Sequence, residues 1–276
     1  MLFYIIIFVL INTINCNYDE FLIKTSLNIS QSTYCLNEES KNNNWECMTC
    51  NENNIYIDLL SQYNELVVFG YNIDYEQIFI SFRGSTNIPN WINNIKFTQI
   101  QPYNNTNISV EKGFYNIFKN LKDEVIDTLN NIKLKYKTEK ILITGHSLGG
   151  ALSTLLAFEM LYINNYNAND IILITFGSPR VGNEEFTTLI NNYHIYSNRI
   201  THYYDIVPHI PQQFLKYNHI SQEIWYNEDN SIYTLCNDKN NIEDISCSDS
   251  CSPTHCTSTT DHMNYLNISM GQGGLC

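Results

Sequence analysis

Two patterns of apolar residues alternate along this chain, and their alternation limits its fold more than any other feature. Five short runs are apolar enough for buried strands, several of them on both faces. Between them, apolar residues recur at three- and four-residue steps from Phe114 to Ile132 and from Leu148 to Leu156, as in helices. This order predicts an α/β fold, with a mostly parallel central sheet and helices on both faces. The strand candidates are 66–71, 77–82, 140–144, 171–176 and 200–204.

Length and composition favour a single domain. The chain has 276 residues, 43% of them hydrophobic, and α/β domains of this size are commonly undivided. The sequence has no internal repeat or interdomain linker, so we expect one domain over residues 17–276. The formal net charge is −13 at pH 7 and the basic residues are scattered. This charge argues against nucleic acid and against an anionic membrane as partners.

The first sixteen residues differ from the rest. Residues 2–11 are apolar, small and polar residues follow to Cys16, and no charged side chain precedes Asp19. A transmembrane helix needs roughly 20 apolar residues. A signal peptide over residues 1–16 therefore explains the run better than an uncleaved anchor or a hydrophobic first strand. We expect the mature protein to be secreted, or to reside in the secretory-pathway lumen, without a transmembrane anchor.

Cysteine usage agrees with an oxidising compartment. Cleavage after Cys16 would leave eight of the nine cysteines, an even number that predicts up to four disulfides. Cys47 and Cys50 have the spacing of a redox or zinc pair, but no second pair repeats it in a compact module. We therefore expect no metal. Four N-x-S/T sequons mark candidate glycosylation sites at Asn28, Asn104, Asn107 and Asn267.

A candidate nucleophile stands at the end of the third strand candidate. Ser147 lies in the pattern G-x-S-x-G, between an apolar strand and an apolar helix. Such a serine needs a crowded strand-to-helix turn, and glycines at positions 145 and 149 would remove the clashing Cβ atoms. The alternative is an ordinary glycine-rich turn. His146 is too close to the serine to act as its base, so we interpret it as structural.

A serine nucleophile needs a histidine base and a carboxylate that orients the histidine. Asp205 directly follows the last strand candidate, at the same sheet edge as the serine. His209 is too close to this aspartate to fold back onto it, and His255 lies between two cysteines. Spacing alone leaves His219 and His262 as candidates for the base.

Several sequence blocks follow one another in the order of a known family. Together they resemble the fungal-type class 3 lipase family, which has the α/β-hydrolase fold, and the resemblance covers roughly residues 55–276. The blocks are 82–85 (FRGS), 145–150 (GHSLGG), 176–183 (FGSPRVGN), 202–211 with the aspartate followed by Ile-Val-Pro, 217–226, and Asp261-His262 followed by Tyr265.

The resemblance implies the roles of the site residues. It implies that Ser147, Asp205 and His262 form a catalytic triad, and that His219 has a structural role. The strand-to-helix turn at Ser147 itself predicts that the backbone N–H of Leu148 faces a developing oxyanion. The resemblance places a second oxyanion donor at Ser85, although residues 83–85 read alone also fit a simple turn.

A short amphipathic helix is predicted directly after Ser85. Asn87 is a plausible N-cap and Pro89 falls in the first turn. The position resembles the family's lid, whose apolar face covers the nucleophile in water and turns outward at a lipid surface. The alternative is a helix packed permanently on the core. The apolar residues of the predicted lid are Ile88, Trp91, Ile92 and Ile95.

The resemblance also implies a pairing of cysteines. Carried over by position, it joins Cys35 to Cys276, Cys47 to Cys50, and Cys236 to Cys247. Two cysteines are then left over, Cys251 and Cys256, which could close an extra loop.

The whole pattern predicts a secreted serine ester hydrolase that needs no cofactor. A triacylglycerol lipase, with lipid or ester substrates at a lipid–water interface, is the preferred hypothesis. A feruloyl esterase or phospholipase of the same fold is the nearest alternative, and a catalytically silent lipid-binding protein is a more distant one. The sequence does not decide acyl-chain preference or oligomeric state.

Overall fold

The structure is a computed structural model. It describes residues 18–35, 55–62, 65–104, 106–238, 242–251 and 255–271, with only the backbone of 55–62, 65 and 66. Its centre is an eight-stranded sheet in the order β1-β2-β3-β6-β7-β8-β9-β10, and the five strands β3, β6, β7, β8 and β9 run parallel to one another. The strands are β1 (Ile55–Gln62), β2 (Glu65–Asn72), β3 (Gln77–Phe82), β6 (Ile141–His146), β7 (Ile171–Phe176), β8 (Tyr196–His202), β9 (Glu223–Tyr226) and β10 (Tyr233–Leu235).

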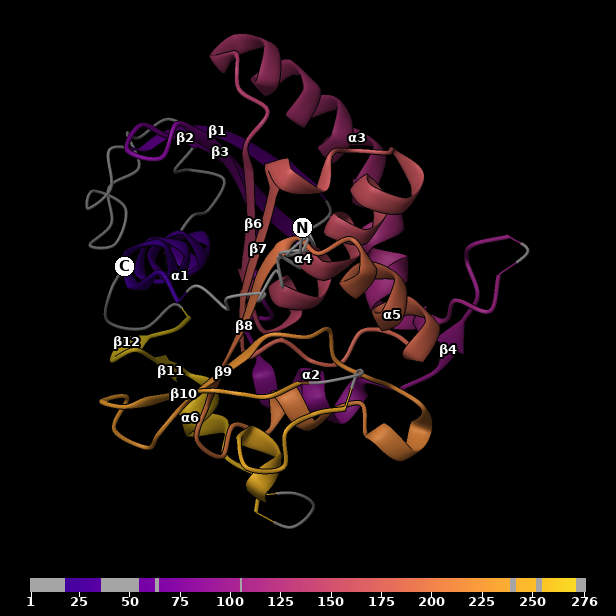
Figure 1. Cartoon of the computed structure of the whole chain (residues 1–276), viewed down its shortest axis with the longest axis vertical. Coiled ribbons are helices and arrows are strands. Elements are labelled where there is room, and N and C mark those ends of the chain that lie inside the picture. Colours follow the sequence, from indigo (N-terminus) through magenta and orange to yellow (C-terminus); the bar gives the residue numbers. More distant parts are fainter. Residues whose placement is uncertain are drawn as a thin grey trace, which may run out of the picture.

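Helices cover both faces of this sheet, so the predicted α/β architecture is confirmed. In Figure 1, α1 lies on one side of the sheet and α3, α4 and α5 lie on the other. The helices are α1 (Glu20–Cys35), α2 (Ile88–Asn94), α3 (Lys112–Tyr136), α4 (Leu148–Phe158), α5 (Glu184–Asn192) and α6 (Thr259–His262). Short strand pairs flank them: β4 (Gln99–Ile100) with β5 (Val110–Glu111), and β11 (Asn264–Tyr265) with β12 (Ile268–Ser269).

The two faces of each central strand feed two separate cores. In β6, Ile141 and Ile143 point to the core under α3 and α4, whereas Leu142 points to the core under α1. Alternation of this kind follows from the two-residue repeat of a strand. Because both faces are covered, all six residues of β6 are buried. This double burial is why the parallel strands have apolar residues on both faces.

Helix α3 has the local signals of a stable helix. Six of its apolar residues lie on one face and are buried. The Glu111 carboxylate accepts a hydrogen bond from the N–H of Phe114 (2.8 Å) as an N-cap, and Lys137 ends the helix in the left-handed conformation. Lysines in the last turn complement the helix dipole. Helix α4 is buried along its whole length, as its apolar composition requires.

Helix α1 is the element that the apolar pattern predicts least. Most of its residues are buried although many are Ser, Thr, Asn or Gln. Their hydroxyls bond to carbonyls of the preceding turn: Ser26 Oγ donates to Leu22 O (2.7 Å) and Ser30 Oγ to Ser26 O (2.9 Å). Ser30 also bonds with Thr144 Oγ1 of β6 (2.9 Å). Because these polar groups have partners, a polar helix can cover a sheet face.

Two disulfides join described cysteines, Cys236–Cys247 and Cys251–Cys256. The first is the pair that the resemblance implied, and the second is the predicted extra loop. Cys35 is also disulfide-bonded, but Cys276, Cys47 and Cys50 lie outside the described residues. The predicted signal peptide lies outside them as well. No helix within the described ranges is long and apolar enough to cross a bilayer.

Candidate active site

The candidate nucleophile stands where β6 turns into α4. Ser147 has φ 59° and ψ −128°, a conformation that is costly for a residue with a side chain. The surrounding backbone holds it there, since its N–H donates to Phe176 O in the neighbouring strand (2.9 Å). A Cβ atom on Gly145 would lie 2.5 Å from the backbone of Gly149, and one on Gly149 would lie 2.1 Å from Phe82 O. The glycines therefore permit the turn, as predicted.

The structure brings Asp205 and His262 together from segments 57 residues apart. The Nδ1 atom of His262 lies 2.9 Å from Asp205 Oδ2, and both side chains are almost completely buried. The second carboxylate oxygen, Oδ1, accepts a hydrogen bond from the N–H of Val207 (2.8 Å). A carboxylate held in this way fixes which ring nitrogen of the histidine has the proton and leaves Nε2 free to act as a base.

Two further residues shape this contact, and the sequence reading did not assign a role to either. Tyr265 donates its buried hydroxyl to the same Oδ2 of Asp205 (2.5 Å). Burial, followed by the charge of Asp205, raises the pKa of Tyr265 well above its ordinary value, so the hydroxyl stays a donor. Gly177 has φ +52°, and a Cβ there would lie 2.7–2.9 Å from Tyr265 Oη, Asp205 Oδ2 and His262 Nδ1. Its missing side chain makes room for the cluster.

His146 connects the nucleophile turn to the His262 segment. One ring nitrogen bonds with the Tyr34 hydroxyl of α1 (2.7 Å) and the other with the backbone oxygen of His262 (2.8 Å). Because it is buried, its pKa lies well below the ordinary value for histidine. A neutral ring that is hydrogen-bonded through both nitrogens agrees with the structural role expected for His146. The other candidate base, His219, instead donates to Pro208 O (2.8 Å) and does not contact Asp205.

The predicted oxyanion donors lie on two sides of Ser147. Leu148 follows the serine and begins α4. Ser85 follows Gly84 at the end of β3, and a Cβ on Gly84 would lie 3.2 Å from the Cβ of Ser147. The end of β3 therefore passes directly beside the nucleophile. The Oγ of Ser85 accepts a hydrogen bond from the N–H of Asn87 (3.4 Å).

Comparison with known proteins agrees with this geometry. A model of the family "Lipase (class 3)" matches residues 79–215. A lipase from Rhizomucor miehei is 31% identical over 235 residues, which cover 82% of this chain and 63% of that protein. The chain belongs to the class 3 lipase family. It spans just under two thirds of the length of this curated relative and of the lipase from Rhizopus niveus.

Solved structures of lipases share the fold of this class 3 family member. Lipase II from Rhizopus niveus superimposes with a TM-score of 0.83 at 25% identity, over 91% of this chain and 95% of that one. A second neighbour, with a TM-score of 0.81 at 27% identity over the same shares, is described as a triacylglycerol lipase whose catalytic centre is a serine protease triad. The fold of this chain is therefore the α/β-hydrolase fold.

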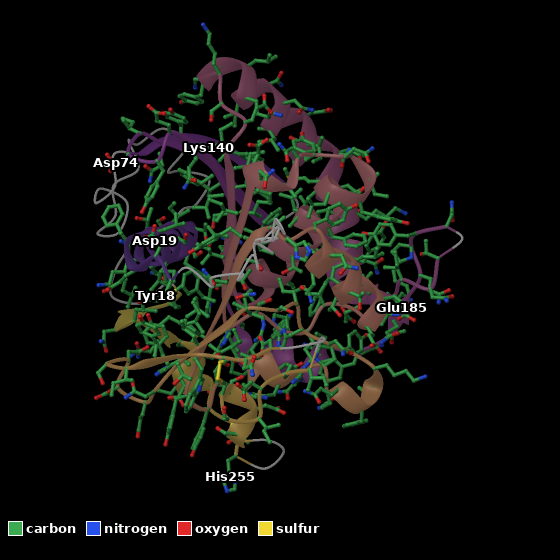
Figure 2. All side chains as sticks on the ribbon, viewed as in Figure 1. Tyr18, Asp19, Asp74, Lys140, Glu185 and His255 are labelled. Carbon is green, nitrogen blue, oxygen red and sulfur yellow. A yellow bond between two sulfur atoms is a disulfide. The ribbon has the colours of Figure 1, made fainter. Side chains whose placement is uncertain are left out.

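The site of this class 3 family member is closed to solvent. Neither Ser147 nor His262 has exposed surface, and neither Ser147 Oγ nor His262 Nε2 has a hydrogen-bond partner among the described residues. Figure 2 shows Lys140, just before β6, near one end of the molecule and His255 at the other. The carboxyl ends of the parallel strands, and with them the candidate site, face the His255 end.

The predicted lid is a helix, α2, with the predicted cap. Asn87 Oδ1 accepts a hydrogen bond from the N–H of Asn90 (3.1 Å), and Pro89 lies in the first turn. Ile88 is buried, while Trp91, Ile92 and Ile95 are partly buried. Trp91 stacks on Phe114 of α3 with ring centroids 6.1 Å apart. The helix therefore packs on the core by one face; whether it opens stays a prediction.

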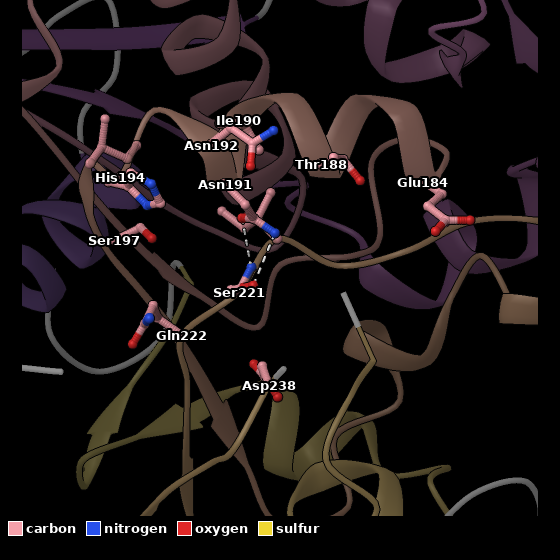
Figure 3. A pocket seen from close by; sticks show the side chains of 12 residues that line it. Glu184, Thr188, Ile190, Asn191, Asn192, His194, Ser197, Ser221, Gln222 and Asp238 are labelled. Atoms are coloured by element: carbon pink, nitrogen blue, oxygen red, sulfur yellow. Dashed lines mark hydrogen bonds between the residues drawn. The ribbon is translucent and has the colours of Figure 1, made fainter. Parts of the chain in front are cut away.

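A groove of about 660 Å³ lies away from Ser147, Asp205 and His262, along α5 and the start of β8. Most of the residues that line it are polar, among them Glu184, Asn191 and Asp238 (Figure 3). Asn191 and Asp238 are already hydrogen-bonded, to Ser221 and to the N–H of Glu223 respectively. The groove is lined by none of the three candidate triad residues.

The four predicted glycosylation sites differ in how exposed their asparagines are. Asn104, Asn107 and Asn267 are exposed, so glycans at these positions stay a prediction. Asn28 lies inside α1 with only 7% of its surface exposed. A bulky glycan needs an accessible asparagine, so the burial of Asn28 argues against that prediction. The sequon alone could not reveal this, because α1 covers the sheet with a polar face.

Proposed function

We propose that this chain is a secreted serine hydrolase of carboxylic esters whose substrates are acylglycerols. One observation supports this most directly: Ser147 Oγ and His262 Nε2 are buried and have no hydrogen-bond partner in the part of the chain that the structure describes, while His262 Nδ1 lies 2.9 Å from Asp205 Oδ2. A nucleophile and a base that have no competing partner, with a carboxylate on the far ring nitrogen, are the parts that acyl transfer needs.

In the proposed reaction, Ser147 Oγ attacks the carbonyl carbon of the ester while His262 Nε2 takes the hydroxyl proton. Asp205 keeps the remaining proton on Nδ1 and stabilises the imidazolium that forms. Tyr265 and the N–H of Val207 hold the carboxylate in place through its two oxygens. His262 then gives its proton to the leaving alcohol, and a water molecule hydrolyses the acyl-enzyme with His262 again as base.

The negative charge of the tetrahedral intermediate needs donors on the other side of Ser147. The backbone N–H of Leu148, at the N-terminus of α4, is one, and Ser85 at the end of β3 supplies the other. The positive end of the α4 dipole adds to the stabilisation. Loss of one such donor typically lowers turnover by about 10²- to 10³-fold.

The substrate class is inferred from the relatives and from α2. Relatives are named triacylglycerol lipase and secreted mono- and diacylglycerol lipase. In this chain, the apolar residues Ile88 and Trp91 lie on α2, the helix that follows Ser85 closely in sequence, and Ile95 is its C-cap. An apolar surface of this kind suits long acyl chains and a lipid–water interface. The disulfides Cys236–Cys247 and Cys251–Cys256 fit an extracellular protein.

The proposal is tested by hydrolysis of p-nitrophenyl esters of increasing chain length and of emulsified triacylglycerol. We expect long-chain activity that rises above the solubility limit of the substrate. The Ser147→Ala variant should lose at least about 10⁴-fold in turnover, because the nucleophile is gone.

The other outcomes separate the alternatives. Cleavage of short or aromatic esters alone would keep the triad but point to a feruloyl esterase, and cleavage of phospholipid alone would point to a phospholipase. If the folded protein cleaves none of these esters, the catalytically silent lipid-binding hypothesis takes its place. Matching circular dichroism of wild type and Ser147→Ala shows that any loss is not unfolding.

A further inference from the structure

Asp205 and His262 meet at a corner that is organised by one residue, Ser258. The N–H of Ser258 donates to Tyr204 O (3.0 Å), and its carbonyl accepts from the N–H of Ile206 (3.2 Å). These two bonds bracket Asp205 on both sides. The Oγ of Ser258 accepts a hydrogen bond from the N–H of Asp261 (2.9 Å) and caps the short helix α6. His262 is the last residue of that helix.

Asp261 adds two more links between the same segments. Its Oδ2 accepts from the N–H of Tyr204 (3.3 Å), and its backbone carbonyl accepts from Nδ1 of His202 (3.0 Å). A helix of four residues has too few internal hydrogen bonds to be stable alone. The orientation of His262 therefore depends on these contacts with the end of β8.

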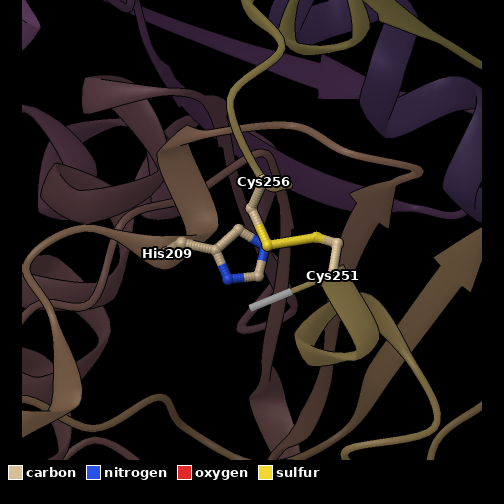
Figure 4. A group of neighbouring side chains, drawn as sticks. All are labelled: His209, Cys251 and Cys256. Carbon is tan, nitrogen blue, oxygen red and sulfur yellow. A yellow bond between two sulfur atoms is a disulfide. The ribbon is translucent and has the colours of Figure 1, made fainter. Parts of the chain in front are cut away.

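The Cys251–Cys256 disulfide lies at the start of this arrangement. Cys256 precedes Ser258 by two residues, and both cysteines are buried. Cys251 Sγ lies 3.8 Å from Nε2 of His209, four residues after Asp205 (Figure 4). The disulfide thus contacts the segment after Asp205 and is joined to the segment that leads to His262. Its sulfur atoms are bonded to each other, so they are not metal ligands here.

We propose that the Cys251–Cys256 disulfide is a positioning element, which holds Ser258 in place and through it sets Asp205 against His262. This inference rests on the proposed ester hydrolysis. The second disulfide, Cys236–Cys247, differs. The N–H of Cys236 donates to Glu223 O (3.0 Å) and that of Cys247 to Asp244 O (3.0 Å), so these bonds lead to β9 and to the loop before Cys247, not to Ser258 or α6. Both disulfides close short loops of the same part of the chain, yet only Cys251–Cys256 directly precedes the segment that leads through Ser258 to His262.

Without the Cys251–Cys256 disulfide, residues 255–258 gain freedom, and the Asp205–His262 contact loosens. Displacement of a catalytic group by about 1 Å can lower turnover roughly 10²-fold. We therefore expect kcat to fall by about 10- to 100-fold with little change in KM, because the disulfide is not part of the substrate surface.

The experiment compares two double variants of the full chain, C251A/C256A and C236A/C247A. The steady-state kcat and KM of each are measured on a soluble short-chain p-nitrophenyl ester, together with the melting temperature. The proton on His262 Nδ1 is followed by its far-downfield NMR resonance, assigned by its loss in His262→Ala. We expect both variants to melt lower, but only C251A/C256A to lose turnover and the sharp downfield resonance.

Equal losses of kcat in the two variants, or an unchanged resonance in C251A/C256A, would overturn the proposal. If C251A/C256A does not fold, Ser258→Ala takes its place, since it keeps the disulfide and removes the cap. Its kcat should fall several-fold and recover in Ser258→Thr, which caps equally well; no recovery would count against the proposal. A wild type that cleaves no ester defeats the proposed function, whereas the resonance still tests the positioning.

Discussion

The nucleophile turn and the Asp205–His262 corner are built in opposite ways. The turn comes from eighteen consecutive residues, β6 and α4 with Ser147 between them, and glycines at fixed positions permit its backbone. The corner is assembled from segments 57 residues apart, and Ser258, Gly177 and Tyr265 all come from beyond the immediate neighbours of Asp205. Local sterics are visible in a short stretch of sequence, whereas a corner of this kind depends on how distant segments pack.

The largest expected effect is on the turn. In Gly149→Ala, the new Cβ would lie 2.1 Å from the backbone oxygen of Phe82, so β3 itself would have to move. We expect the free energy of unfolding to fall by about 3 kcal/mol or more, as for severe overpacking. Urea denaturation measures it.

Gly113→Ala is the matched control for the turn. Its Cβ would lie 2.9 Å from a side-chain atom, Glu111 Oε2, and not from backbone, so the carboxylate can shift. That shift weakens the cap on Phe114 by about 1 kcal/mol, which the gain from alanine in a helix roughly offsets. This variant should stay within about 1 kcal/mol of wild type. Similar stabilities of the two variants would show that the turn is not held by close backbone packing.

The next effect is on the corner and concerns turnover. In Gly177→Ala, the added Cβ lies within 2.9 Å of Tyr265, Asp205 and His262, at φ +52°. We expect kcat to fall by about 10²-fold or more, because His262 is displaced from Asp205. Gly271→Ala, which also has a positive φ but meets only the flexible end of Met263, is the control. An equal loss in both variants would mean that backbone strain, not displacement, causes it.

A smaller effect is expected from Tyr265→Phe. The variant removes the hydroxyl that donates to Asp205 Oδ2 and keeps the ring. We expect kcat to fall by about tenfold, the equivalent of one hydrogen bond to a charged group. Tyr226→Phe removes a hydroxyl bonded to Tyr18 instead and should leave kcat unchanged. If the two variants behave alike in ester hydrolysis, Tyr265 does not support Asp205.

The smallest effect is the pH dependence of stability. Burial lowers the pKa of both His146 and His219, the latter helped by the charge of Arg199. Below about pH 6.5 the unfolded chain therefore binds a proton on each of these histidines, while the folded chain does not. The contribution of the two neutral histidines to the free energy of unfolding is thus fully present above about pH 6.5 and is lost as the pH falls below it. The slope is at most about 1.4 kcal/mol per pH unit for each histidine.

Urea unfolding at pH 7.5, 6.5 and 5.5 measures this slope. His219→Gln keeps a donor for Pro208 O but does not titrate, so it should be less sensitive to pH than wild type. His146, which links the turn to the corner, would contribute to the remaining slope. A slope that is the same in the variant would show that His219 does not contribute.

The elements predicted best are two central strands of the sheet, covered on both faces. Residues 77–82 and 171–176 were predicted as strands and are β3 and β7 with the same bounds, because both of their faces are apolar. The strand predicted at 200–204 begins and ends too late: β8 spans Tyr196–His202, and its first residues are polar and do not stand out as a strand. Helix α1 was not predicted, because its buried side chains are largely hydroxyls and amides whose partners are in its own preceding turn.

By itself, the sequence determined the alternation of strands and helices, the turn at Ser147, and the cap and amphipathic face of α2. All of these depend on neighbours within a few residues, where sterics and periodicity act directly. Spacing could not choose between His219 and His262, and it gave Gly177, Tyr265 and Ser258 no role. The family resemblance implied His262, but only the tertiary structure shows its contact with Asp205 and the surroundings of that contact, because packing of distant segments creates the buried corner.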